Sequence, residues 1–125
     1  MKVSKIDGNG NHLMLEGYGG DLGKLDDLKL IKNILDFLPG ELGLNKISEP
    51  LVVRCNAGDE SGISGVILMA ESHISIHTYS KKNFAVMDLF SCKEFDVDKV
   101  IKILKNKFEF EKINKRLVVR EYEKN

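Results

Sequence analysis

The chain has 125 residues, enough for one hydrophobic core but short for two domains. Its 19 Lys and Arg residues balance 19 Asp and Glu residues, so no net positive charge attracts a nucleic acid or an anionic membrane. No segment approaches the roughly 18 to 20 consecutive apolar residues that span a bilayer, and no apolar run follows the first residues as in a secretion signal.

The elements expected in chain order are a strand at 12–16, a helix at 24–38, strands at 51–55, 63–70, 73–78 and 84–90, a helix from Asp96, and a strand at 116–122. The first helix is predicted from apolar residues at helical spacing, and Pro39 is expected to end it. Asp96 is a suitable N-cap for the second helix. The strands are mostly rich in apolar, β-branched or aromatic residues.

This order of elements predicts an α+β fold, with one antiparallel-rich sheet and both helices on one face of it, a two-layer sandwich. The two segments that carry helices are the only long connections, which favours a single domain over residues 1–125. The second face of the sheet then needs a partner, and we expect the sheets of two copies to pack face to face in a homodimer.

The densest run of reactive side chains is 71–78, Glu-Ser-His-Ile-Ser-Ile-His-Thr, which follows an apolar segment. On a strand, His73, Ser75 and His77 share one face. A zinc site is disfavoured, because a spacing of four on a strand separates the two imidazoles by roughly 13 Å. A serine hydrolase is also disfavoured, because Gly-Ile-Ser-Gly at 62–65 lacks the second residue between Ser and Gly of a nucleophile elbow.

Three segments in combination resemble a known family, although each alone fits a solvated strand. They are Gly-Ile-Ser-Gly at 62–65, Ala-Glu-Ser-His-Ile-Ser-Ile-His-Thr at 70–78 and Asp-Leu-Phe-Ser-Cys at 88–92. Together they resemble the short prokaryotic class of pyruvoyl-dependent S-adenosylmethionine decarboxylases. The match is dense over 62–93 and looser at His12-Leu13 and Tyr18-Gly19.

Members of that family cut their own chain between the Glu and the Ser of this motif. The resemblance therefore implies scission between Glu71 and Ser72, giving a β chain of residues 1–71 and an α chain of residues 72–125. Ser72 becomes a pyruvoyl group, which forms a Schiff base with the substrate amine and accepts electrons as carbon dioxide leaves, so no external cofactor is implied.

The resemblance also implies roles for other residues. His77 is the base that processes the chain, Ser64 assists by hydrogen bonding to His77 or to the Glu71 carbonyl, and Cys92 returns a proton to the substrate carbon. Residues five apart on a flat strand face opposite sides, so contact of His77 with Ser72 requires a bend. We therefore expect a turn or bulge at about residues 70–73.

The implied activity is decarboxylation of S-adenosylmethionine to the aminopropyl donor for spermidine, and the presence of only two cysteines favours a reducing cytoplasm. Only two cysteines occur, so no disulfide framework is expected, and Cys55, which has no counterpart in the motif, is predicted to be a buried strand thiol. The family members form dimers with the catalytic pockets near the subunit contact. No metal is implied.

The sequence departs from the family at residues 56–61, where better-known members carry an aromatic residue that stacks on adenine. Asp59 and Glu60 in this loop are candidates for binding a cationic substrate group, or they form a solvated turn. An arginine or ornithine decarboxylase on the same scaffold is therefore an alternative, as is an unprocessed partner of an active copy. Other candidate stacking residues are Tyr18, Tyr79, Phe84 and Phe90.

Overall fold

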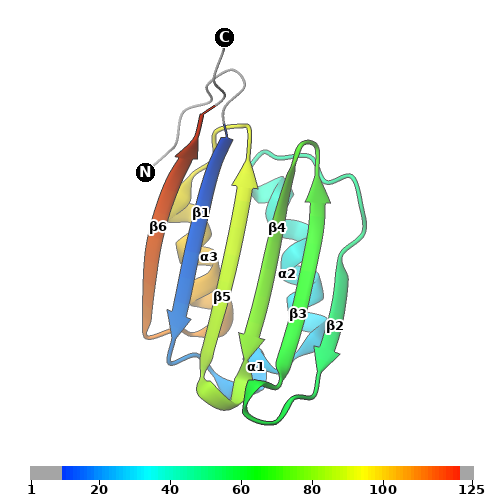
Figure 1. Ribbon diagram of the computed structural model, residues 1–125, viewed down its shortest axis with the longest axis vertical. Coiled ribbons are helices and arrows are strands. Elements are labelled where there is room, and N and C mark those ends of the chain that lie inside the picture. The colour runs from blue at the N-terminus through cyan, green and yellow to red at the C-terminus, as the bar shows by residue number, and fades with distance from the viewer. Residues whose placement is uncertain (1–9, 122–125) are drawn as a thin grey trace.

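The computed structural model describes residues 10–121, and these residues form one antiparallel sheet with helices on one face (Figure 1). The strands are β1 (Gly10–Tyr18), β2 (Leu51–Cys55), β3 (Gly62–Met69), β4 (Ser72–Tyr79), β5 (Phe84–Ser91) and β6 (Lys112–Arg120). Their order across the sheet is β2-β3-β4-β5-β1-β6, so β2 and β6 are its edges. The predicted α+β class is confirmed.

Each helix begins at an aspartate whose carboxylate accepts a hydrogen bond from a backbone N–H of the first turn. The helices and their caps are α1 (Leu22–Leu25) with Asp21, α2 (Leu28–Glu41) with Asp27, and α3 (Val97–Phe108) with Asp96. The cap predicted at Asp96 is confirmed. Two short 3-10 turns, η1 (Gly58–Glu60) and η2 (Ser80–Lys82), lie together at one end of the sheet.

The bounds of two expected elements are wrong. The helix predicted over 24–38 is two helices, because Asp27 caps a new helix after α1 ends, and α2 continues past Pro39 to Glu41. A proline near the end of a helix removes only one hydrogen bond, and Leu42 N–H still reaches the Leu38 carbonyl at 3.2 Å. The last strand begins at Lys112, ahead of the predicted 116–122, because its polar first half lies on an exposed edge; residue 122 is outside the described residues.

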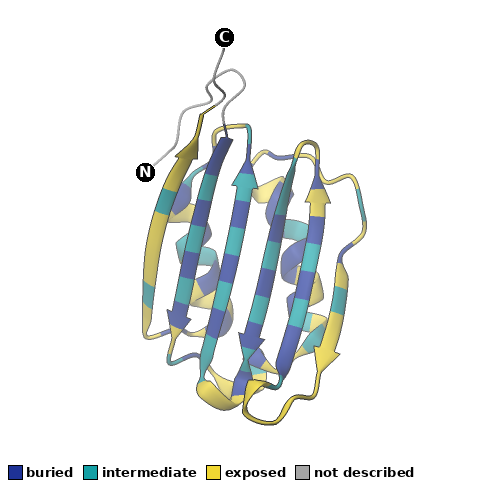
Figure 2. Cartoon of the chain, viewed as in Figure 1, coloured by how far each residue is buried: buried dark blue, intermediate teal, exposed yellow. Residues whose placement is uncertain are grey.

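The core lies between the sheet and the two long helices. Along the central strands buried residues alternate with half-buried ones, so the inward side chains pack under α2 and α3 (Figure 2). Gly65 of β3 allows a close approach, since a Cβ there would lie 2.6 Å from Leu35 Cδ1 of α2. None of the helices within residues 10–121 is long and apolar enough to cross a bilayer.

The face of the sheet opposite α2 and α3, here called the open face, has no covering element among the described residues. It carries His12, Glu16, Ser64, Val66, His73, Ser75, His77, Val86, Asp88, Phe90 and Arg116. Its most exposed apolar side chains lie at the corner formed by β2 and β3, where Leu51 is 64%, Val53 54% and Leu68 51% exposed, while Val118 on the opposite edge is 47% exposed. The open face is therefore mixed in polarity, with one apolar corner.

Candidate active site

The peptide between Glu71 and Ser72 lies at a tight turn. A two-residue connection, Ala70 and Glu71, joins β3 to β4, and Met69 pairs with Ser72 across it. Glu71 has a φ of 59°, in the left-handed region that costs a residue with a Cβ about 1 kcal/mol or more. The turn expected at residues 70–73 is confirmed, and the backbone strain lies at the residue just before Ser72.

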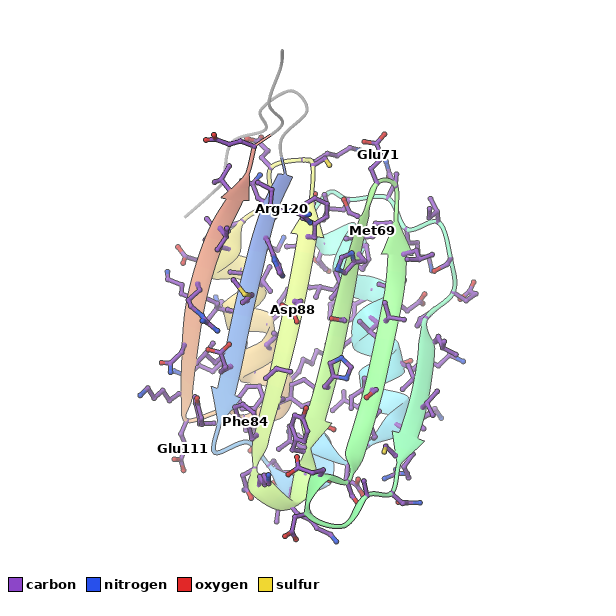
Figure 3. The ribbon with its side chains drawn as sticks, in the orientation of Figure 1. Met69, Glu71, Phe84, Asp88, Glu111 and Arg120 are labelled. Atoms are coloured by element: carbon purple, nitrogen blue, oxygen red, sulfur yellow. The ribbon has the colours of Figure 1, made fainter. Side chains whose placement is uncertain are left out.

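Cys92 contacts both sides of this peptide. It follows the end of β5, its backbone N–H donates to Ser72 Oγ at 3.4 Å, and its thiol donates to the Glu71 carbonyl oxygen at 3.6 Å. A donor at that carbonyl stabilises negative charge that develops on its oxygen when a nucleophile attacks the carbon. The structure thus brings Glu71, Ser72 and Cys92 together, at the end of the sheet where Figure 3 labels Glu71.

Ser64 and His77 form a second pair, on the open face. They are directly opposite each other on β3 and β4, and Ser64 Oγ lies 2.8 Å from His77 Nδ1. The pair lines a hollow of about 180 Å³ whose other walls include Leu51, Val53 and Val66. Of the two partners expected for Ser64, His77 and the Glu71 carbonyl, the hydrogen bond is to His77, and it fixes the orientation of the imidazole.

The two pairs do not meet within one chain. β4 runs without a break from Ser72 to Tyr79, so five residues of extended strand, about 16 Å, separate Ser72 from His77. The turn lies before Ser72 and not between Ser72 and His77, so it does not bring them together. The expectation that His77 reaches Ser72 within the same chain is therefore wrong.

Asp59 and Glu60 also lie far from Ser72 in the same chain. They are in η1, before β3 begins, and the eight residues of β3 separate them from the turn by about 26 Å. Glu60 Oε1 accepts a hydrogen bond from Lys82 Nζ at 2.5 Å, which raises the pKa of Lys82. The charge of Glu60 is therefore already compensated within the chain.

Comparison with known proteins places this geometry in a family. The family model for S-adenosylmethionine decarboxylase matches residues 11–121. An S-adenosylmethionine decarboxylase proenzyme of Sulfurihydrogenibium sp. (strain YO3AOP1) is 36% identical over 115 residues, covering 88% of this chain and 84% of that protein. One of Persephonella marina is 32% identical over 112 residues, covering 86% of this chain and 81% of that protein.

A solved structure agrees with these matches. The crystal structure of the adenosylmethionine decarboxylase from Aquifex aeolicus superposes with a TM-score of 0.74 at 29% identity, covering 93% of this chain and 96% of that one. The chain belongs to the S-adenosylmethionine decarboxylase family. The resemblance seen in the motifs is therefore confirmed, and the family supports a decarboxylase activity for the chain.

The structure also locates Cys55 and the candidate stacking residues of this S-adenosylmethionine decarboxylase family member. Cys55 is exposed, contrary to prediction, because it is the last residue of the edge strand β2. Three candidate stacking residues form one row on the open face near η2, with ring centroids 5.1 Å apart for Tyr18 and Phe84 and 5.7 Å apart for Tyr79 and Phe84. Phe90 lies apart from them, near the Ser72 end.

Two interactions on the open face, one at the middle of the sheet and one near its Ser72 end, could not be found in the sequence. His12 Nε2 lies 3.0 Å from Asp88 Oδ1, and the Arg120 guanidinium carbon lies 5.0 Å from the centre of the Phe90 ring. Both depend on β1 lying between β5 and β6, which no local pattern indicates. Within residues 10–121 no cluster of three His, Cys, Asp or Glu side chains is arranged to hold a metal ion.

Proposed function

We propose that this chain is a self-processing, pyruvoyl-dependent decarboxylase of S-adenosylmethionine. The observation that carries the proposal is the contact of the Cys92 thiol with the carbonyl of Glu71, next to the Ser72 hydroxyl and at a strained residue. The names of the relatives, which describe proenzymes of S-adenosylmethionine decarboxylase, support the same reaction. The two free thiols suit a reducing cytoplasm.

Scission uses groups that the turn brings together. Ser72 Oγ attacks the Glu71 carbonyl carbon, the peptide C–N bond breaks, and an ester joins Glu71 to the Ser72 oxygen, with the Cys92 thiol stabilising the charged oxygen. A base then removes the α-proton of Ser72, and the Cβ–Oγ bond breaks so that Glu71 leaves as a carboxylate. Water converts the remaining dehydroalanine to a ketone and releases ammonia.

The base is assigned to His77 of the partner subunit in a homodimer. A two-fold axis between two open faces, perpendicular to the strands, sets the Ser72 end of one sheet over the His77 end of the other. This arrangement covers the apolar corner at Leu51, Val53 and Leu68. Ser72 then meets an imidazole of the partner subunit, whereas about 16 Å separates it from His77 of its own chain.

In the processed enzyme, a pyruvoyl group at position 72 would supply an electron-withdrawing carbonyl for loss of carbon dioxide, without an external cofactor. Cys92 is placed beside that position, with its N–H 3.4 Å from Ser72 Oγ, and is half-buried. A thiol there donates a proton to the substrate carbon after decarboxylation. In the dimer, η1 of the partner subunit is carried towards this site, so Asp59 and Glu60 stay proposed substrate contacts from across the interface.

We expect Glu71→Gly to slow scission by up to about fivefold, because glycine adopts the left-handed conformation without strain and about 1 kcal/mol no longer assists the reaction. The measurement is a time course of cleavage after refolding of the freshly denatured precursor. Glu71→Ala is the matched control, since it removes the carboxylate but keeps the strain. Equal slowing of both variants would show that the carboxylate, not the backbone, is responsible.

Mass spectrometry and a substrate panel test the proposed function. We expect two fragments split after residue 71, the second blocked to Edman degradation, and carbon dioxide release from S-adenosylmethionine. Release from arginine or ornithine instead would favour the alternative raised by the loop at 56–61, which has no aromatic residue. A chain that stays intact would favour the unprocessed partner.

A further inference from the structure

Arg120 lies in the same row of the sheet as the scissile peptide. Gly10 of β1 pairs with Arg120 of β6, and Asn11 pairs with Ser91, so continuing that register one step places Gly10 beside Cys92. On the other side of β5, His73 pairs with Phe90, and the same continuation places Glu71 beside Cys92. The row across the sheet is therefore Glu71, Cys92, Gly10 and Arg120.

The Phe90 ring fills the space over Gly10 and supports the arginine. A Cβ at Gly10 would lie 2.3 Å from Cε1 of Phe90, so only glycine leaves room for the ring in this row. The Arg120 guanidinium carbon lies 5.0 Å from the ring centre on one side, and the His73 ring centre lies 6.0 Å away. Figure 3 shows Arg120 directed from β6 over β1 at the end of the sheet that carries Glu71.

Among residues 10–121, Arg120 is also the arginine that makes no ion pair with a carboxylate. Of the three arginines in the chain, Arg54 pairs with Asp26 at 2.6 Å and Arg116 pairs with Glu16 at 3.3 Å. In the part of the chain that the structure describes, Arg120 has an aromatic ring as its contact and no carboxylate. Its planar donors are thus held in one orientation by stacking and are available to an incoming anion.

We propose that Arg120 binds the α-carboxylate of the substrate. This inference rests on the proposed function, which places the substrate amine at position 72. The carboxylate is on the same carbon as that amine and must lie within a few ångströms of it. Position 72 on β4 and Arg120 on β6 are three strand spacings, about 14 Å, apart, and the Arg120 side chain shortens this gap because it reaches over the Phe90 ring of β5, next to β4. A guanidinium accommodates a carboxylate with two parallel hydrogen bonds.

The test compares substrate and product affinities in Arg120→Gln. We expect normal self-cleavage, a KM for S-adenosylmethionine raised about ten- to a hundredfold, and an inhibition constant for decarboxylated S-adenosylmethionine within about twofold of the unaltered enzyme, since the product has no carboxylate. Arg120→Lys should recover part of the affinity. Arg116→Gln, on the same strand but paired with Glu16, is the matched control and should leave the KM unchanged.

Each other outcome counts against the inference. An unchanged KM in Arg120→Gln, or equal loss of substrate and product affinity, overturns it. Gly10→Ala, which displaces the Phe90 ring, should raise the substrate KM in the same direction, and an unchanged value contradicts the role of the ring. If the unaltered chain stays uncleaved, the proposed function fails first and this inference with it, whereas a processed Arg120→Gln enzyme with normal kinetics refutes Arg120 alone.

Discussion

We expect Ser72→Ala to abolish scission and to leave a single intact chain without decarboxylase activity. The variant has no hydroxyl to attack the Glu71 carbonyl, so neither the ester nor the ketone forms. We expect no detectable fragment by mass spectrometry after days of incubation, against complete or near-complete cleavage of the unaltered chain. The fold is preserved, because only the 3.4 Å hydrogen bond from Cys92 N–H is lost.

Ser75→Ala is the matched control for this prediction. Ser75 lies three residues along the same strand, is half-buried beside the hollow at Ser64 and His77, and contacts neither Glu71 nor Cys92. We expect it to be cleaved at the normal rate. Cleavage of Ser72→Ala at residue 71 would contradict the assignment of the nucleophile, whereas slowed cleavage of Ser75→Ala would report on the hollow that Ser75 lines.

A mixture of two inactive variants is expected to regain cleavage. His77→Ala lacks the base and Ser72→Ala lacks the nucleophile, so each alone stays uncleaved or stops at the ester. In a mixed dimer, the Ser72→Ala chain supplies Ser64 and His77 to the intact Ser72 of its partner. After co-refolding in equal amounts, about half of the His77→Ala chains should be cleaved, the share that random pairing places in mixed dimers.

The control for this mixture is His77→Ala combined with the double variant Ser72→Ala, His77→Ala, which supplies no imidazole to any site. Its fragments should be absent, and hydroxylamine should release chain from any ester that has accumulated. Cleavage of His77→Ala alone, or no cleavage in the complementary mixture, would show that His77 does not act across the dimer. Sedimentation of Ser72→Ala reports in parallel whether the dimer forms.

The sheet and its helices were predictable because local signals determine them. Alternating apolar residues define the central strands, and the aspartate before α3 identifies its start. The break between α1 and α2 was missed because the apolar spacing continues through it, while Asp27 caps a new helix. The first half of β6 was missed because it lies on an exposed edge of the sheet. Few of its side chains are buried there, so residues 112–115 do not show the alternation of apolar and polar residues that predicts a strand.

The site was predictable in part. The sequence places Glu71, Ser72 and Cys92 in one motif set, and the hydrogen bond between Ser64 and His77 follows from the pairing of two neighbouring strands. The distance between Ser72 and His77 could not be predicted from the motifs. It depends on whether the turn lies before Ser72 or between Ser72 and His77, and the motifs do not specify this. The stacking of Arg120 on Phe90 depends on long-range strand order, which spacing along the chain does not encode.

The position of β1 determines what scission does to the molecule. Cutting after Glu71 assigns β1, β2 and β3 to one polypeptide and β4, β5 and β6 to the other, yet β1 lies between β5 and β6. The two polypeptides are thus interleaved, and neither can leave without breaking three ladders, β3 with β4, β1 with β5 and β1 with β6. The cut enzyme should remain one particle in native buffer, whereas its refolding from denaturant becomes bimolecular and depends on protein concentration.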